Sequence, residues 1–232
     1  MEQVADTRRQ RGKGDDMKEH PVLMSNPMVR AILEGRKTMT RRVIKNGLPI
    51  GAKWWKIDDC GDGNELLYRM VDSFNVRTHC KCPYKIGNQL WLKETWQLAE
   101  WYSDHWEPAA LKDNNCHTTF KKYKADEEIE NLKWRPSIFM PRWASRITLE
   151  ITGVRVERVQ DITESEAFKE GAQYHDGLGV GHNGWRHDTE GFVYNNARSS
   201  FVALWDSINS KRGFGWDANP WVFVIEFKVI KP

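Results

Sequence analysis

The segment from Gly35 to Arg42, GRKTMTRR, holds the residue types needed for nucleophilic catalysis. A threonine hydroxyl is a weak nucleophile until a neighbour accepts its proton, and a lysine can accept it if burial or nearby cations lower its pKa. Arg36, Arg41 and Arg42 supply such cations. Lys37 and Thr40 would point to opposite faces of a continuous strand, so they converge only if Lys37 lies in a turn, which Gly35 favours. The alternatives are a solvated basic strand or a phosphate-binding rim without catalysis.

Glu170 is a second candidate because it breaks a local rule. It follows the segment TESEAFK and directly precedes Gly171, so it falls at the end of a predicted helix. The helix dipole disfavours a carboxylate there and favours its protonated form, which suits a general acid. The alternative is an exposed glutamate at a helix end with little effect on stability.

The cysteines and histidines give weak evidence for a metal site. His79, Cys80 and Cys82 are close in sequence and Cys60 could complete a set of four ligands, but C-x-C is narrower than the usual zinc spacing. Three later histidines, His175, His182 and His187, lack metal-motif spacing, and we expect them to be solvated loop residues. We therefore predict no metal and no other cofactor. No nucleophile-elbow or phosphate-loop pattern is present.

The elements that must position these residues are readable from periodicity and caps. A helix is expected from Pro27 to about Glu34 with Asn26 as N-cap, and a second opens at Thr163 with a Thr163/Glu166 capping box. Further patterns predict a helix and three strands: the helix carries Phe201, Leu204, Trp205 and Ile208, and the strands are Leu90–Trp96, Ser145–Val159 with a bulge at Gly153, and a final strand from Trp221 to Val229.

The two longest strands should share one core. Ile147, Leu149 and Ile151 alternate with polar residues, and so do Trp221, Phe223, Ile225, Phe227 and Val229 in the last strand. Such alternation is useful only if both strands turn those faces inward. The expected fold class is α+β with a strand-dominated core, and the last strand should have one buried side.

The chain is predicted to form one domain. Residues 1–16 are polar, lack periodicity and read as a flexible tail, and residues 17–232 form the domain. Two long connections, near 97–135 and 172–196, are expected to be inserted loops of the kind that serve as lids or binding segments.

Composition indicates the cellular compartment and the charge of possible partners, but it says little about activity. The chain has 232 residues, 35 Lys plus Arg against 32 Asp plus Glu, and 12 Trp. The net charge of +3 permits an anionic partner without requiring one. The start of the chain has no apolar signal segment and no apolar run is long enough to span a bilayer, so we expect a cytoplasmic protein without a membrane partner. Composition does not determine the oligomeric state.

Four segments together resemble the ASCH-domain proteins common in phages and prophages. They are PMVRAILEGRKTMTRRVIK, GNQLWLKETW, PRWASRITLEITGVRVERVQDITESEAFKEG, and FVALWDSIN with NPWVFVIEF. The resemblance implies a mixed β-barrel of the PUA-like superfamily with flanking helices. It also implies a cleft beside the GRKT segment that accepts a nucleotide or RNA.

Within that superfamily, the sequence is similar to the small N(4)-acetylcytidine amidohydrolases at their motifs. Their motif G-R-K-T-x-T places a catalytic Lys and Thr where this chain has Lys37 and Thr40. Their motif L-T-E-x-x-A-x-x-E ends in a catalytic Glu where this chain has Glu170. The resemblance implies an amidohydrolase, but this chain is longer and its substrate can differ.

Two functions therefore compete. A metal-dependent nuclease ranks third, because the sequence lacks the clustered carboxylates that hold the metal in such enzymes. In the first, Lys37 is the base, Thr40 the nucleophile and Glu170 the proton donor in hydrolysis of an acyl amide on a modified pyrimidine nucleoside. In the second, the protein binds RNA or DNA without chemistry. For either function, residues expected to hold the substrate or nucleic acid are Arg36, Arg41, Arg42, Glu94 and Trp96.

Overall fold

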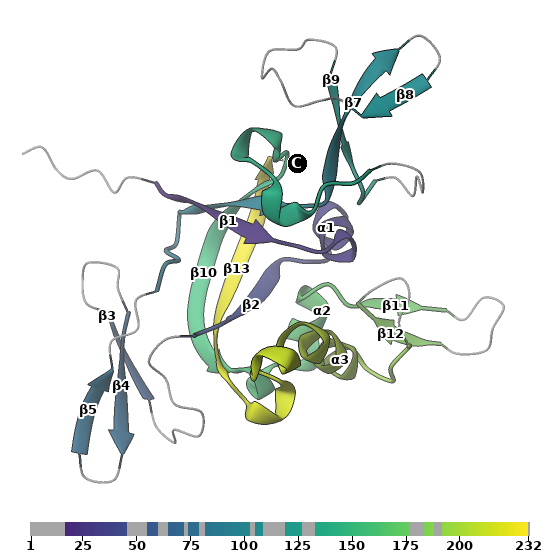
Figure 1. Cartoon of the computed structure of the whole chain (residues 1–232). Helices are drawn as coiled ribbons and strands as arrows, with labels where there is room; N and C mark the ends of the chain where they lie inside the picture. The colour runs from purple at the N-terminus through teal and green to yellow at the C-terminus, as the bar shows by residue number, and fades with distance from the viewer. Residues whose placement is uncertain are drawn as a thin grey trace, which may run out of the picture.

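The architecture is mixed α+β and is given by a computed structural model (Figure 1). The structure describes residues 17–45, 55–59, 65–71, 74–78, 82–102, 105–108, 119–126, 133–176, 183–187 and 192–231. The predicted tail, residues 1–16, lies outside the described residues. None of the described helices has the length and apolarity needed to cross a membrane.

A five-stranded sheet with the order β1-β6-β10-β13-β2 forms the centre of the fold. Its strands are β1 (Glu19–Leu23), β6 (Gln89–Lys93), β10 (Thr148–Arg158), β13 (Trp221–Lys231) and β2 (Met39–Val43). β1 runs parallel to β6, and the other neighbours are antiparallel. The long pair β10 and β13 curves through the middle of the molecule in Figure 1.

The predicted shared core is confirmed on one face of this sheet. Ile147, Leu149 and Ile151 pack in one cluster with Phe223, Ile225 and Phe227, and Trp221 packs against it partly buried. The bulge expected at Gly153 is also present, as a register shift between Ile151 and Gly153. Val229, which continues the same face of β13, lies outside this core, and its side chain is 39% exposed near the end of the strand.

The final strand is buried on both sides, where the sequence predicted one. Val222 and Val224 belong to a second cluster with Phe201 and Trp205. The alternation in β13 hides this, because valine fills the face that was expected to be polar. The sheet is therefore covered on one face by α1 and on the other by α2 and α3.

The expected closed barrel is not formed by the described strands, in which β1 and β2 are the two edges of the sheet. No ladder joins these edges in the described part of the chain; instead the Arg42 side chain spans them, with Nη2 donating to the Leu23 carbonyl at 2.9 Å. A side chain in this position separates the backbones, since ladder strands must lie about 4.8 Å apart. The gap between the two edges holds the cavity described below.

In the described part of the chain, three α-helices flank the sheet: α1 (Asn26–Leu33), α2 (Glu164–Lys169) and α3 (Ala197–Asn209). The capping box of α2 is confirmed, with Thr163 and Glu166 bonded reciprocally. The cap predicted for α1 was wrong by one residue, because Ser25 takes the extended N-cap conformation and Asn26 begins the helix. Short 3₁₀ turns are η1 (Ser137–Phe139), η2 (Arg142–Ala144), η3 (Val159–Asp161), η4 (Ser210–Arg212) and η5 (Trp216–Ala218).

The two predicted loop insertions contain strands. In the region 97–135, β7 (Trp96–Tyr102) pairs with both β8 (His105–Pro108) and β9 (Thr119–Tyr123). In the region 172–196, β11 (Gln173–His175) and β12 (Gly184–Arg186) form a hairpin. A further sheet consists of β3 (Trp55–Asp59), β4 (Glu65–Val71) and β5 (Phe74–Thr78). The length and charge of the two insertions suggested loops, but aromatic and β-branched residues within these stretches favour strands.

Replacing Ile151 by Ala should lower the free energy of unfolding by about 2–5 kcal/mol, because the side chain is fully buried and its removal leaves a cavity. Val229→Ala on the paired strand is the control and should cost at most about 1 kcal/mol, since Val229 is exposed. Urea denaturation measures both. Equal losses would show that the shared core is misassigned.

Candidate functional site

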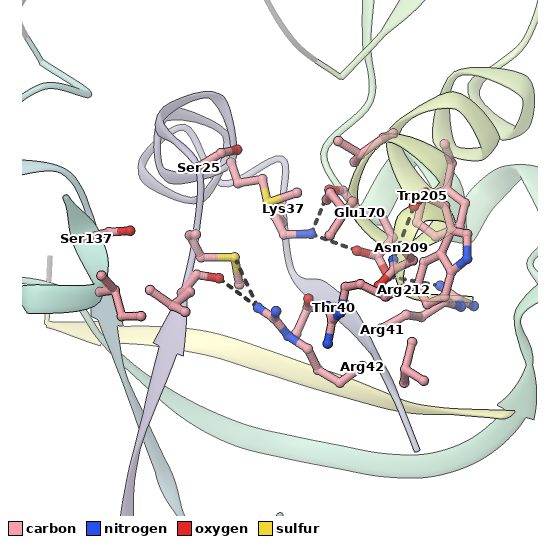
Figure 2. Close-up of a pocket in the computed structure, with 18 of the residues that line it drawn as sticks. Ser25, Lys37, Thr40, Arg41, Arg42, Ser137, Glu170, Trp205, Asn209 and Arg212 are labelled. Carbon is pink, nitrogen blue, oxygen red and sulfur yellow. Dashed lines mark hydrogen bonds and ion pairs between the residues drawn. The ribbon is translucent and has the colours of Figure 1, made fainter. Parts of the chain in front are cut away.

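A cavity of about 690 Å³ opens between the end of β1, strand β2 and helix α3. Its polar wall includes Lys37, Thr40, Arg41, Arg42 and Glu170. Its apolar wall comes mainly from α1 and α3: Met28, Phe201, Leu204, Trp205 and Ile208. Figure 2 shows the Lys37 side chain pointing toward Glu170, and Arg42 reaching from β2 toward the end of β1. A cavity of this volume is in the range of small-molecule sites.

Lys37 lies in the turn between α1 and β2, the position that its approach to Thr40 requires. Gly35 has φ +74°, a left-handed conformation that glycine adopts without strain and that turns the chain out of α1. The Lys37 backbone N–H donates to the Ala31 carbonyl at 2.9 Å, and the next residue bonds to Lys169 in α2. These bonds fix the turn, so that Lys37 and Thr40 line the same cavity.

Lys37 and Glu170 form a buried ion pair. Their side chains are 1% and 4% exposed, and Lys37 Nζ is 2.7 Å from Glu170 Oε2. Nζ also donates to the Glu170 carbonyl at 2.8 Å, at the end of α2. Burial lowers the pKa of Lys37, and the Glu170 charge and hydrogen bond oppose that shift without cancelling it. The ammonium is therefore easier to deprotonate than an exposed lysine.

Gly171 allows the two elements that carry this pair to approach. Its φ is +109°, and a Cβ there would lie 3.2 Å from the Ala31 Cβ and 3.4 Å from the Lys37 Cβ. A larger residue would be strained by its backbone and would press on both neighbours. The close contact between α1, the turn and the end of α2 thus depends on glycine.

Arg41 is the centre of a second, larger group of charges. Its side chain is fully buried and its guanidinium pairs with Glu157 at 3.4 Å, Glu166 at 3.0 Å and Glu170 at 3.2 Å. Arg155 joins the same group by contacting Glu157, Glu166 and Glu226. Glu166 thus serves both the α2 cap and Arg41. Arg41 holds the inner carboxylates and has no exposed surface for nucleic acid.

Thr40 and Arg42 share the opposite face of β2, because alternate residues of a strand point to the same side. Thr40 pairs in register with Ile225 and is nearly buried, with its side chain in the cavity wall. Arg42 also lines the cavity, held by Leu23 and by the Met24 Sδ at 3.7 Å. The structure therefore brings together Lys37, Thr40 and Glu170 with Arg41 and Arg42.

Arg36 points away from this cavity. Its guanidinium contacts Glu34 and donates to the Gly171 carbonyl at 2.8 Å. It lines a smaller cavity of about 160 Å³, together with His175 and His187. His187 is not a free loop residue as predicted, because its Nδ1 lies 2.7 Å from the Ser200 Oγ.

Glu94 and Trp96, both predicted to hold the substrate, do not line the main cavity. Glu94 is fully buried and paired with Arg146 through contacts of 3.0 and 3.1 Å. Burial raises the pKa of Glu94, and the Arg146 hydrogen bonds oppose this shift. Trp96 is 1% exposed and packs against Trp143 in a separate small core. Neither side chain has the exposed surface that base stacking or substrate binding requires.

Several cavity residues were missed by sequence reasoning. Tyr84, Lys45, Asn209 and Arg212 all line it. The apolar residues of α3 could have indicated the cavity. Phe201 and Trp205 of this helix are buried in the core, whereas Ile208, at the same helical spacing, is 46% exposed. An apolar stripe wider than the core needs indicates a second apolar surface, which here is the cavity wall.

Among the described residues no group of three His, Cys, Asp or Glu is arranged to hold a metal. Cys82 is buried and its thiol bonds to the Tyr84 carbonyl at 3.2 Å. The other proposed ligands, Cys60, His79 and Cys80, lie outside the described residues, as does His182.

Comparisons of this chain with protein-family models, with curated proteins and with solved structures gave no match. The functional argument therefore depends on the geometry of the cavity and its charges.

Replacing Arg41 by Met should destabilise the fold by about 3–5 kcal/mol at neutral pH, because it removes the one buried cation that three carboxylates share. Burial raises the pKa of Glu166, but bonds from Thr163 and the charges of Arg41 and Arg155 outweigh it and hold this pKa below 4.5. A depressed pKa stabilises the fold above about pH 4.5 and loses this effect in acid. The deficit of Arg41→Met should therefore shrink as the pH falls.

The matched control is Arg142→Met. Arg142 pairs with Glu19 at the surface, where both side chains are about two-fifths exposed (42% and 40%). Losing such a pair costs about 0–1 kcal/mol. Denaturation of both variants at pH 7 and pH 4 distinguishes them, and equal costs at pH 7 would contradict a central role for Arg41.

Proposed function

We propose that the protein hydrolyses an acyl amide on a modified pyrimidine nucleoside such as N(4)-acetylcytidine. One observation carries the proposal: the buried Lys37 Nζ lies 2.7 Å from Glu170 Oε2 and opens, with Thr40, onto a single cavity. A buried lysine with a lowered pKa that shares a cavity with a hydroxyl residue is the pair from which an activated nucleophile can be built.

The first step uses Lys37 as base and Thr40 as nucleophile. A neutral amine has two N–H donors and one lone pair. Glu170 accepts two donors from Nζ, through its carbonyl at 2.8 Å and its carboxylate at 2.7 Å. The lone pair is then available for the Thr40 proton. The Thr40 Oγ attacks the acyl carbon and forms the new C–O bond as Lys37 takes that proton.

The second step releases the amine. The C–N bond of the amide breaks, and the leaving nitrogen receives a proton from the Lys37/Glu170 pair. Water then attacks the acyl-threonine ester as Lys37 takes one of its protons. The bond between the acyl carbon and Thr40 Oγ breaks, Lys37 returns that proton to Thr40 Oγ, and the acyl group leaves as a carboxylic acid. Arg41 contacts Glu170 Oε1 at 3.2 Å, so that carboxylate keeps a cationic partner whichever way the proton moves.

The remaining walls of the cavity suit an aromatic base. Met28, Leu204 and Ile208, which are partly or well exposed, provide accessible apolar surface beside the polar wall, and a base can pack on such side chains. The volume of about 690 Å³ has room for a nucleoside with its acyl group.

A binding module without chemistry is less well supported. Two of its expected contacts, Arg41 and Trp96, are buried and engaged in contacts within the protein. A surface that only binds nucleic acid needs exposed cations and aromatic rings, and it gives no reason to bury a lysine against a glutamate.

Single substitutions should separate the three roles. Thr40→Ala removes the nucleophile, Lys37→Ala removes the base and Glu170→Gln removes proton transfer, so each should lower the rate of cytidine release by ~10²-fold or more. Chromatography of the purified protein with N(4)-acetylcytidine measures the rate.

Thr38→Ala is the matched control, since Thr38 is exposed, lies two residues away and does not line the cavity. It should retain wild-type activity. If wild type releases no more cytidine than Lys37→Ala, and related acylated pyrimidines are also untouched, the proposed hydrolysis is wrong.

The reaction rate should rise with pH as Lys37 loses its proton and then level off. Burial lowers the Lys37 pKa below its ordinary 10.5, so the rise should be centred below that value. Glu170 opposes this shift, and Glu170→Gln should therefore move the rise in residual activity to lower pH. A profile of kcat against pH, measured for wild type and for Glu170→Gln, checks both expectations. If the midpoint of the rise is the same in Glu170→Gln as in wild type, Glu170 does not influence the group that acts as base.

A further inference from the structure

Three cations in the cavity are left over after the proposed catalytic group has been assigned. Lys37 and Arg41 are already balanced by glutamates. Arg42, Lys45 and Arg212 also line the cavity, and no ion pair joins any of them to a carboxylate among the described residues. We call these three the rim cations. Glu170 is the only carboxylate in the described cavity wall, and Lys37 and Arg41 already contact it.

Two of the rim cations, Arg42 and Arg212, act on one another. Burial lowers the pKa of Arg42, and the positive charge of Arg212 lowers it further, while Tyr84 and Glu170 oppose the shift. Like charges facing a shared cavity destabilise each other unless an anion lies between them. Arg42 also has a buried Nε without a hydrogen-bond partner in the described part of the chain. The cavity therefore has both unbalanced positive charge and unused donor capacity.

The positions of these residues indicate where such an anion would lie. Arg42 is on β2 and is held by the Leu23 carbonyl, whereas Arg212 follows α3 in η4. Figure 2 shows Arg212 beside Asn209 and Trp205, on the α3 side of the pocket. Lys45 and Arg212 are exposed, so the rim cations extend from the buried wall to solvent. Arginine and lysine in this arrangement suit a phosphate, which accepts several charge-assisted hydrogen bonds.

We propose that the cavity binds its pyrimidine substrate as a phosphorylated nucleoside, with the phosphate on Arg42, Lys45 and Arg212. The proposal rests on the proposed function for the identity of the base. The apolar side chains of α3 would contact the base, and the rim cations would hold the phosphate at the open side. The substrate class is thus a nucleoside monophosphate in preference to a free nucleoside.

Binding of the product tests this without any catalysis. Cytidine and cytidine 5′-monophosphate differ by the phosphate alone. In isothermal titration, the wild-type protein should bind the monophosphate at least about tenfold more tightly than it binds cytidine. That advantage should weaken as salt is added, because the rim is open to solvent and its charges are screened.

Arg212→Gln and Lys45→Gln should each reduce the advantage severalfold while leaving cytidine binding unchanged. Both residues are exposed, so these variants are expected to fold. Lys211→Gln is the control: it removes the same charge from the neighbouring exposed residue, which does not line the cavity, and should behave as wild type.

The contrary results are distinct. Equal affinity for cytidine and its monophosphate would overturn the phosphate site and leave the proposed hydrolysis standing. An advantage that survives Arg212→Gln together with Lys45→Gln would place the phosphate elsewhere and overturn the assignment. Tight binding of a short cytidine oligoribonucleotide without binding of the monophosphate would replace the nucleotide by a polymer. Conversely, monophosphate binding by a protein that hydrolyses no acylated cytidine would retain the site and reject the hydrolysis.

Discussion

The burial of Lys37 and Arg41 is the constraint on which the rest of this structure depends. Removing a charged group from water costs several kcal/mol, and only close partners can offset that cost. Glu170 contacts both cations, at 2.7 and 3.2 Å, and Glu157 and Glu166 complete the shell of Arg41. These residues come from the turn after α1 and from β2, β10 and α2, so the charges can be balanced only when all four elements are in place.

The same requirement accounts for the opening in the sheet. The backbone of residue 38 is bonded to α2 and to β13, which holds the start of β2 against the helices. The far side of β2 then faces the end of β1 across the Arg42 side chain, with no ladder between the two strands in the described residues. One face of β2 buries the charges of Arg41, and the free edge of β2 is not paired with β1 in the described residues. The space between β2 and the end of β1 is therefore left open for the cavity. The cavity therefore follows from how the charged elements must meet.

The sequence predicted much of this scaffold, because periodicity and capping are local. The capping box at Thr163, the bulge at Gly153 and the joint core of β10 and β13 are all encoded by neighbouring residues. Partners distant in sequence were not predictable. Glu94 lies in a motif that suggests binding, yet Arg146, 52 residues away, occupies its carboxylate. Likewise Glu170 was singled out by its place at a helix end, but its burial against Lys37 was not predictable, because it depends on Gly171 letting α2 approach Lys37 closely.

The way in which Lys37 and Arg41 share Glu170 is better explained by a need for Lys37 to change its protonation state than by stabilisation of the fold. A permanently charged Lys37 would be best balanced by a carboxylate of its own, yet Glu170 is shared with Arg41. Sharing weakens the preference of Lys37 for its charged form, and burial lowers its pKa further. When Lys37 is neutral, Glu170 still has Arg41 as a cation, so no buried carboxylate is left alone. Arg41 thus makes both protonation states of Lys37 tolerable, which is the property that a buried general base requires.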